Sequence, residues 1–277
     1  MGPERSDREV VDGWAHGVSG TSVRTDRIVH VEHVWNTAIT INIAGTVGRA
    51  SEARVAIGDC SAFFARVDAT FSTYRPLSEV ALHRTGLDGP GAHSVDFVAV
   101  MDRCRDLRVA TGGAFDPWAV PGGYDPSGYV KGWAAGQASE RLAGAGFVDH
   151  LVNAGGDICA HGDEVPGSGH GWPVGIVNPH RPDEVIEVVN LRNQSMATSG
   201  RYERGDHVVV PMTGMPAVEV DSATVIGPDP GAADALASAA MVDGTASVQW
   251  LSALGPEWSL HLVIGSTART YGRAFAT

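Results

Sequence analysis

Residues 28–43, IVHVEHVWNTAITINI, decide the fold. Apolar side chains recur there at every second position, most regularly at Ile39, Ile41 and Ile43. A period of two is typical of a strand with one buried face, so this stretch predicts a pair of strands. Residues 47–71 follow directly and carry apolar side chains at the spacing of a helix. We therefore expect a strand pair followed by a long helix.

The rest of the chain mixes helical and strand-like segments. Helices are expected at residues 95–107, 132–142 and 232–241, and the turn-forming sequence PDPG introduces the last of them. Residues 111–128 hold too many glycines and prolines for regular structure. Because the expected strands cluster instead of alternating with helices, an α+β fold is favoured over a doubly wound parallel sheet. These strands are at residues 148–152, 174–177, 185–189, 208–210, 218–226 and 259–264.

Composition restricts the class of protein. We expect one compact domain over residues 26–277, with clustered mixed or antiparallel strands flanked by helices, after a polar leader at residues 1–25. The net charge of −12 argues against a nucleic-acid partner. No run approaches the roughly 18 apolar residues of a membrane span. The first residues show no signal peptide or lipobox, so the expected location is cytoplasmic.

The basic residues and the cysteines are also informative. Of 20 basic residues, Lys131 is the sole lysine and the others are arginines. A site that needs a compact ammonium group would resist replacement of lysine by arginine, although chance alone could leave one lysine anywhere. The three cysteines lie far apart and form no CxxC, so neither a disulfide framework nor a zinc site is indicated.

Three glycine-rich or polar clusters suit a ligand, and each has a purely structural alternative. GYVKG at residues 128–132 lies where the irregular stretch meets a helix, and a helix N-terminus with a lysine suits a phosphate; a structural turn is the alternative. NAGGD at residues 153–157 follows an apolar strand, where paired glycines make room for a ligand or form a bulge. SGRYER at residues 199–204 is by default a solvated loop.

Two further clusters carry groups for acid–base or metal chemistry. His207 precedes PMTG at residues 211–214, and a histidine can act as a base near neutral pH, although most of the 11 histidines must be surface or structural. ADALAS at residues 233–238 places Asp234 and Ser238 on one helix face. A carboxylate with a hydroxyl suits Mg²⁺ and not zinc. Alternatively, Asp234 occupies the first helical turn, where it favours the helix dipole.

In this order the clusters resemble the ApbE family of FAD:protein FMN transferases, over about residues 37–265. The resemblance lies in seven ordered motifs, and the sole lysine falls on the motif lysine. FSTYR with SE (71–75, 78–79) resembles the family motif S-x-Y…S-E, and GAFDP (113–117) matches G-x-F-D-P. Residues 128–132 match the end of GG-I-A-K-G, residues 153–157 match N-x-G-G-D, and residues 199–204 match S-G-x-Y-E-R. His207 with residues 211–214 matches H-x-x-x-P-x-T-G, and residues 233–238 resemble A-D-A-L-A-T.

The resemblance implies a set of site residues. A Mg²⁺ ion is expected on Asp234, Ser238 and the backbone carbonyl of Val130, and FAD is the expected substrate. Either His207 or Asp157 would take the proton of the attacking hydroxyl; the residues do not choose between them. The expected FAD-binding residues are Tyr74 and Glu79 on the flavin side, with Asp116, Gly128, Lys131, Asn153, Gly155, Gly156, Ser199 and Thr213.

The implied reaction moves the FMN half of FAD onto a threonine or serine hydroxyl of an acceptor protein and releases AMP. The expected acceptor carries a motif similar to D-x-x-[ST]-[GA]-A-T. Two alternatives remain open: an FAD pyrophosphatase that gives FMN and AMP, and a non-catalytic FAD-binding or carrier protein.

Several positions depart from the family pattern. The family's Met-Gly-Thr is replaced by WNT at residues 35–37, and the metal-binding threonine is replaced by Ser238. Gly136 stands where an aspartate is usual, and Ser127 replaces a motif glycine. Only residues 117–130 separate Asp116 from Lys131, so an insertion that walls the site in typical members is expected to be missing.

Overall fold

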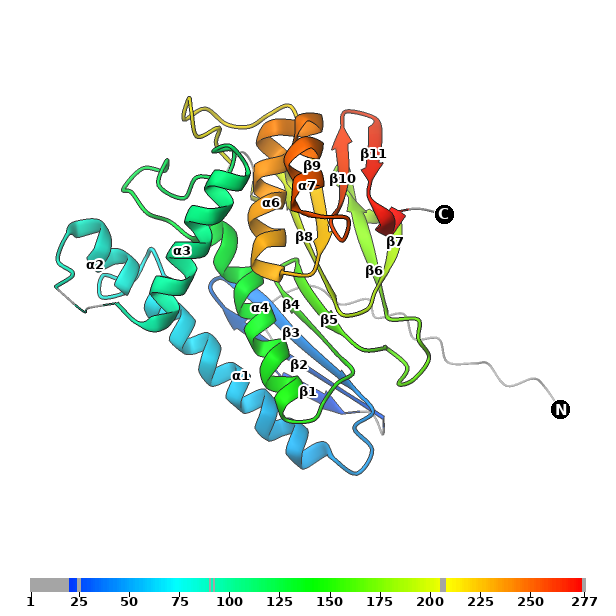
Figure 1. Cartoon of the computed structure of the whole chain (residues 1–277). Coiled ribbons are helices and arrows are strands. Elements are labelled where there is room, and N and C mark those ends of the chain that lie inside the picture. The colour runs from blue at the N-terminus through cyan, green and yellow to red at the C-terminus, as the bar shows by residue number, and fades with distance from the viewer. Residues whose placement is uncertain (1–19, 24–25, 90, 92, 205–207, 276–277) are drawn as a thin grey trace.

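The computed structural model describes residues 20–23, 26–89, 91, 93–204 and 208–275. Within these residues, strands from distant parts of the chain form one sheet of nine strands (Figure 1). Neighbouring strands are antiparallel throughout, which confirms the α+β class. In order across the sheet they are β1 (Gly20–Val23), β2 (Arg27–Val34), β3 (Thr37–Ala44), β4 (His150–Ala154), β5 (Asp157–His161), β8 (Gln194–Gly200), β9 (Ser222–Gly227), β10 (Ser259–Ile264) and β11 (Thr267–Tyr271).

The expected strand pair is the hairpin of β2 and β3, whose register runs from Arg27 opposite Ala44 to Val34 opposite Thr37. Trp35 and Asn36 form the turn, with φ of 58° and 57°. Two successive residues at positive φ match the twist of a two-residue hairpin, and asparagine tolerates this conformation better than tryptophan does. The hairpin therefore ends in a constrained turn that presents an indole ring.

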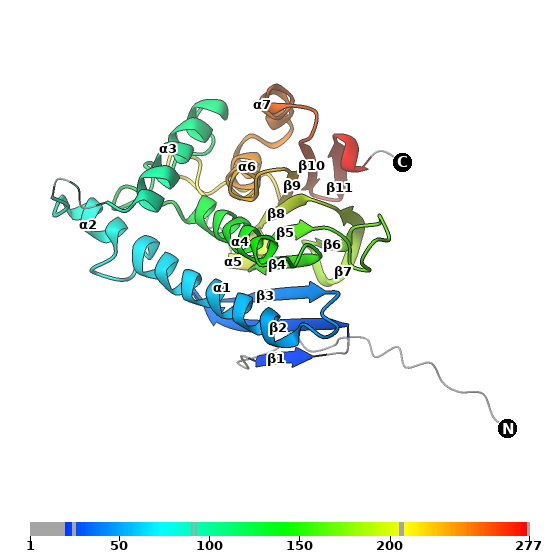
Figure 2. The same cartoon turned by 60° about the horizontal axis from the view of Figure 1, so that its bottom comes forward.

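Three helices lie side by side over one face of the sheet (Figure 2). They are α1 (Ala50–Phe71), α4 (Ser127–Gly144) and α6 (Pro230–Asp243). The apolar face of α1 packs into the main core with side chains such as Phe63 and Phe64, which are fully buried. Outside this layer are α2 (Glu79–Thr85), α3 (Val95–Ala110) and α7 (Ser247–Leu254), and the short helices are α5 (Arg201–Arg204), η1 (Gly244–Ala246) and η2 (Arg273–Phe275).

A two-stranded hairpin of β6 (Trp172–Asn178) and β7 (Arg181–Leu191) covers a second, smaller core. Successive side chains of a strand point to opposite faces of its sheet. Along β5, accordingly, Ile158 and Ala160 belong to this smaller core, whereas Cys159 packs against the helix-covered core. The sheet is thus buried on both faces near β5.

Glycines let α4 and α6 approach closely. A Cβ atom added at Gly132 would lie 2.1 Å from the carbonyl oxygen of Pro230, and one added at Gly136 would lie 2.5 Å from Cγ of the same proline. The aspartate that the family resemblance places at position 136 therefore has no room in this chain. The close contact brings the first turns of both helices together.

Some expected boundaries are wrong. Helix α4 begins at Ser127 and not at Gly132, because the carboxylate of Asp125 accepts a hydrogen bond from the Ser127 amide, 3.0 Å away, and so starts the helix earlier. Residues 128–132 are consequently helical rather than a turn. Residues 208–210 form only an isolated bridge, Val209 to Pro216. Residues 199–204, expected as a solvated loop, are the end of β8 and helix α5.

The structure describes a short part of the expected leader. Residues 20–23 form strand β1, which pairs with β2 from Gly20 opposite Val31 to Val23 opposite Ile28. Residues 1–19, 24 and 25 lie outside the described residues. Among the helices that the structure describes, none has the length and apolar character needed to cross a membrane.

Candidate active site

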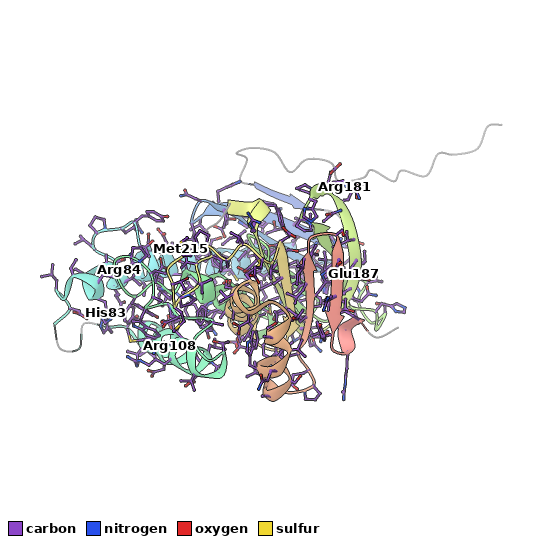
Figure 3. All side chains as sticks on the ribbon, turned by 90° about the horizontal axis from the view of Figure 1, so that it is seen from above. His83, Arg84, Arg108, Arg181, Glu187 and Met215 are labelled. Carbon is purple, nitrogen blue, oxygen red and sulfur yellow. The ribbon has the colours of Figure 1, made fainter. Side chains whose placement is uncertain are left out.

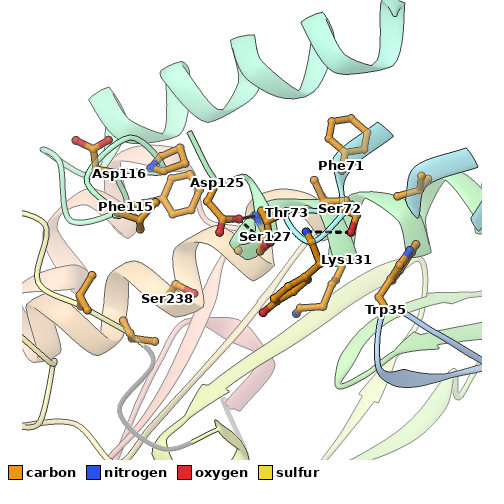
Figure 4. A pocket seen from close by; sticks show the side chains of 18 of the residues that line it. Trp35, Phe71, Ser72, Thr73, Phe115, Asp116, Asp125, Ser127, Lys131 and Ser238 are labelled. Carbon is orange, nitrogen blue, oxygen red and sulfur yellow. Dashed lines mark hydrogen bonds between the residues drawn. The ribbon is translucent and has the colours of Figure 1, made fainter. Parts of the chain in front are cut away.

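A cavity of about 680 Å³ opens between the end of α1, the turn of the β2–β3 hairpin and the start of α4 (Figure 4). Aromatic side chains form much of its wall, and Lys131 and Ser238 also reach it. Of the residues expected from the sequence, six line the cavity: Tyr74, Asp116, Gly128, Val130, Lys131 and Ser238.

Lys131 joins two buried carboxylates beside the cavity. Its ammonium is hydrogen-bonded to the carboxylate of Asp157, from the start of β5, and lies 3.5 Å from Oδ1 of Asp234, on α6. The two carboxylate side chains are only 2% and 5% exposed. Buried carboxylates require a positive partner, and one lysine serves both. The structure therefore brings together three expected residues from three different elements.

Asp234 and Ser238 present oxygen atoms one helical turn apart. Helix α6 begins at Pro230, so Asp234 lies beyond its first turn and the helix-dipole alternative is wrong. Oδ2 of Asp234 accepts a hydrogen bond from the Gly132 amide at 3.3 Å. The Ser238 hydroxyl lies 3.1 Å from that of Ser199, at the end of β8. Carboxylate, hydroxyl and carbonyl oxygens are the ligands that Mg²⁺ prefers. The donor set around Asp234 thus fits the expected ion chemically.

The NAGGD segment forms a tight turn between β4 and β5. The side chain of Asn153 accepts a hydrogen bond from the Gly156 amide at 2.8 Å, so Asn153 holds this turn. Gly155 has a φ of 66°, and a Cβ there would lie 2.4 Å from Oγ1 of Thr37. The turn therefore packs against the β2–β3 hairpin. Residues 153–156 directly precede Asp157 in the chain and do not line the cavity.

The segment before α4 is itself a cavity wall. Asp116 accepts a hydrogen bond from Arg108 at 2.6 Å and another from the Trp118 amide at 2.9 Å, so its carboxylate is fixed. Asp125 forms an ion pair with Arg84 of α2 at 3.3 Å. The short connection between Asp116 and Lys131 is thereby tied to α2 and α3, and it supplies residues such as Phe115 to the cavity.

Glu79 and Thr213 also lie outside the cavity lining, and a third expected residue falls outside the described residues. Glu79 accepts a hydrogen bond from the Ser94 amide at 2.7 Å at the start of α3, and it does not line the cavity. Thr213 lies in an exposed turn, where its hydroxyl accepts a hydrogen bond from the Met215 amide at 3.3 Å. His207 lies outside the described residues. Tyr74 lines the cavity, but its side chain is 89% exposed.

Sequence reasoning missed Trp35 and Phe71, which line the cavity together with Phe115. The signal for Trp35 was present, since WNT replaces a family motif at this position. Burial raises the pKa of the Tyr129 phenol, so this tyrosine stays neutral between α4 and α6. It therefore acts as a packing residue within the GYVKG cluster, next to Gly231.

Part of the chain is similar to a known protein family. Residues 123–257, just under half of the chain, match the sequence profile of the ApbE family. This ApbE segment contains Lys131, Asp157, Asp234 and Ser238, whereas the aromatic cavity wall at Trp35, Phe71 and Phe115 lies before it.

Two relatives of the ApbE segment carry the name FAD:protein FMN transferase. The protein of Treponema pallidum is 35% identical over 136 residues, which are 43% of this chain and 38% of the relative. The protein of Haemophilus influenzae is 33% identical over 138 residues, which are 46% of this chain and 39% of the relative. The match thus spans about two fifths of the length of each relative.

The fold as a whole is that of ApbE structures. The flavin transferase ApbE from Vibrio cholerae superposes with a TM-score of 0.77 over 90% of this chain and 98% of that chain, at 20% identity. The ApbE protein of Thermotoga maritima gives a TM-score of 0.72 over 87% of this chain and 96% of that chain, at 23% identity. The fold likeness therefore extends well beyond the ApbE segment.

Proposed function

We propose that this protein transfers the FMN half of FAD to a threonine or serine hydroxyl of an acceptor protein. The observation that carries the proposal is the cluster of Lys131, Asp157, Asp234 and Ser238 beside a cavity with aromatic walls. The names of the two relatives, which match the segment holding all four residues, support the same activity.

The cavity offers different surfaces to the flavin ring of FAD and to its central pyrophosphate. Trp35, Phe71 and Phe115 supply apolar surface for a flavin ring, and ligand cavities of roughly 300–1,000 Å³ bury most of a bound small molecule. Lys131 and the first turn of α4 also line the cavity, and there an ammonium and helix-end amides attract phosphate. We therefore assign the ring to the aromatic wall and the pyrophosphate to the Lys131 side.

A Mg²⁺ ion would be held by the carboxylate of Asp234, the hydroxyl of Ser238 and the carbonyl of Val130. When bound, it would offset the negative charge of the pyrophosphate. Lys131 supplies a further positive charge, and it keeps Asp157 and Asp234 in place until substrate arrives. The protein's contribution is therefore to position the pyrophosphate and to stabilise charge on the departing phosphate.

The reaction breaks the phosphoanhydride bond of FAD and forms a phosphoester bond to the acceptor. The acceptor oxygen forms a bond to the phosphorus of the FMN half, and the bond from that phosphorus to the bridging oxygen breaks. AMP leaves with the bridging oxygen and its electron pair, and the hydroxyl proton passes to a base. Asp157 and His207 remain the two candidates for this base; Asp157 must first exchange its contact with Lys131.

The decisive experiment supplies the protein with FAD, Mg²⁺ and an acceptor domain that carries D-x-x-[ST]-[GA]-A-T. We expect mass spectrometry to find FMN on the acceptor hydroxyl, and chromatography to find an equal amount of AMP. Free FMN at a rate independent of acceptor would indicate the pyrophosphatase instead. FAD recovered intact would indicate a carrier.

Variants test the assignment of the ion. Asp234→Asn should reduce transfer by roughly 10²–10³-fold, the usual loss when one charge-stabilising group is removed. Asp183→Asn, at an exposed position of β7, is the matched control and should transfer at the wild-type rate. Equal rates for the two variants, with no effect of a chelator on the wild type, would contradict the role of Asp234.

A further inference from the structure

Two histidines and an aspartate converge at the corner between α2 and α3, apart from the cavity. His83 is on α2, Asp88 follows this helix, and His93 precedes α3. Oδ2 of Asp88 lies 2.8 Å from Nδ1 of His83 and 3.0 Å from Nε2 of His93. One potential ligand atom from each of the three side chains lies within 4.8 Å of the other two. The three groups therefore already face a common point.

The carboxylate of Glu79 lies next to the second ring nitrogen of His93. The second ring nitrogen of His93, Nδ1, is buried without a hydrogen-bond partner and lies 3.8 Å from Oε2 of Glu79. The same Oε2 is fixed by the amide of Ser94 at 2.7 Å. A histidine that binds a metal commonly donates its other ring N–H to a carboxylate, which fixes the tautomer. Glu79 occupies the position of such an orienting carboxylate.

The unpartnered nitrogen has a simple explanation if a cation binds here. Nε2 of His93 is hydrogen-bonded to Asp88, and Nδ1 faces the Glu79 carboxylate without a hydrogen bond. A buried polar atom without a partner is unfavourable. With a cation on Nε2, Nδ1 would carry the ring proton and direct it at Glu79.

Packing holds both imidazoles in place. The ring of His93 stacks on Phe97, with centroids 4.2 Å apart and planes inclined by 14°. The ring of His83 meets Phe97 and Tyr124 edge-on, at 5.6 Å and 5.8 Å. Ligands fixed by neighbouring rings lose less conformational freedom when they bind an ion, so the corner is preorganised.

We propose that His83, Asp88 and His93 bind one transition-metal cation of the Zn²⁺ type, with Glu79 as the orienting carboxylate. Two imidazoles and one carboxylate suit Zn²⁺, Co²⁺ or Ni²⁺, whereas Mg²⁺ prefers oxygen ligands alone. This donor set differs from the one at Asp234, so the chain would carry two cation sites of different selectivity. Three protein ligands leave a coordination position for water.

The site would brace the cavity wall. Arg84, next to His83 on α2, donates a hydrogen bond to the carbonyl of Tyr124 at 2.7 Å and pairs with Asp125, which lines the cavity. His83 and Arg84 lie together at one end of the molecule, opposite Arg181 and Glu187 (Figure 3). An ion bound here would join α2 to the start of α3. It would therefore also fix α2, whose Arg84 holds the short connection before α4.

Calorimetric titration of the tag-free chain with Zn²⁺, in saturating Mg²⁺, tests the proposal. We expect one Zn²⁺ ion per chain, and at least 10-fold weaker binding in His83→Gln and in Asp88→Asn. The exposed His170→Gln is the matched control and should bind as the wild type does. Asp234→Asn should also keep Zn²⁺ binding. Loss of binding in Asp234→Asn, or unchanged binding in both corner variants, would overturn the assignment.

A second measurement on the wild-type chain does not depend on variants that fold. Long-range proton–nitrogen NMR of the imidazoles should show Zn²⁺ shifting the ring nitrogens of His83 and His93. It should also show Zn²⁺-bound His93 carrying its ring proton at Nδ1. Imidazole signals at positions 83 and 93 that do not respond to Zn²⁺ would reject the site, even if calorimetry detected binding elsewhere.

Discussion

The position of Lys131 suits a lysine better than an arginine. Its ammonium reaches both Asp157 and Asp234 because it is small and its N–H groups point in several directions, whereas a guanidinium is planar and larger. The composition pointed to this lysine, and the motif order pointed to the two aspartates. Their meeting at one ammonium depends on the packing of α4, β5 and α6, which the sequence does not display.

His150 gives a prediction about pH and stability. Burial lowers the pKa of His150 from 6.5 to about 4, although the hydrogen bond from its Nδ1–H to the carbonyl of Phe147 at 2.7 Å partly opposes this shift. Between pH 6.5 and pH 4 the unfolded chain binds a proton that the folded chain excludes. The free energy of unfolding should therefore fall as the pH falls through this window, by up to roughly 3 kcal/mol.

Urea unfolding at several pH values between 7 and 4 measures this effect. In His150→Asn the slope of unfolding free energy against pH should flatten, whatever the loss of stability at pH 7. His170→Gln, which alters an exposed histidine, should keep the wild-type slope. A wild-type slope that survives in His150→Asn would assign the acid sensitivity to other groups.

At the scale of elements, hydrophobic alternation correctly predicted β2 and β3, and helical spacing correctly predicted α1 and α3. The strand β11, TARTY, was missed because its side chains are largely exposed and carry no apolar period. The start of α4 was misplaced for another reason. Its glycines at positions 128 and 132 look like loop residues in the sequence, but they are helical positions that face α6.

The contact between α4 and α6 leads to a matched pair of substitutions. Gly132→Ala places a methyl group against the backbone of Pro230 and should lower the free energy of unfolding by about 1–3 kcal/mol or more. Gly58→Ala, in the interior of α1, meets no atom within 4 Å and should raise it by roughly 0.5–1 kcal/mol. Denaturant unfolding of both variants makes the comparison. Helix propensity alone would change both stabilities in the same direction, so similar stabilities of the two variants would contradict the close packing.

The molecule as a whole assembles the candidate site from both parts of the chain. Lys131, Asp157, Asp234 and Ser238 fall within residues 123–257, but the aromatic wall comes from residues before them. The antiparallel pairing of β3 with β4, Ile41 opposite Val152, joins the two parts. Sequence order predicted the polar half of the site, since its motifs are local. The wall depends on this long-range pairing and was only partly foreseen.

A ligand that contacts both parts should stabilise the whole fold. Because FAD and Mg²⁺ are proposed to share the Asp234 side of the cavity, each should increase the affinity for the other. Ligands at about 100 times their dissociation constant stabilise a protein by roughly 2.7 kcal/mol, which corresponds to a rise in melting temperature of roughly 5–10 °C for a chain of this size.

Thermal unfolding with FAD alone, Mg²⁺ alone and both together tests this coupling, with chromatography to verify that FAD stays intact during the scan. The shift with both ligands should exceed the sum of the separate shifts. Asp234→Asn should retain the shift with FAD alone and lose the excess, whereas Asp183→Asn should keep it. Strictly additive shifts in the wild type would show that Mg²⁺ and FAD do not bind at one site. An excess that persists in Asp234→Asn would show that the ion binds elsewhere in the molecule.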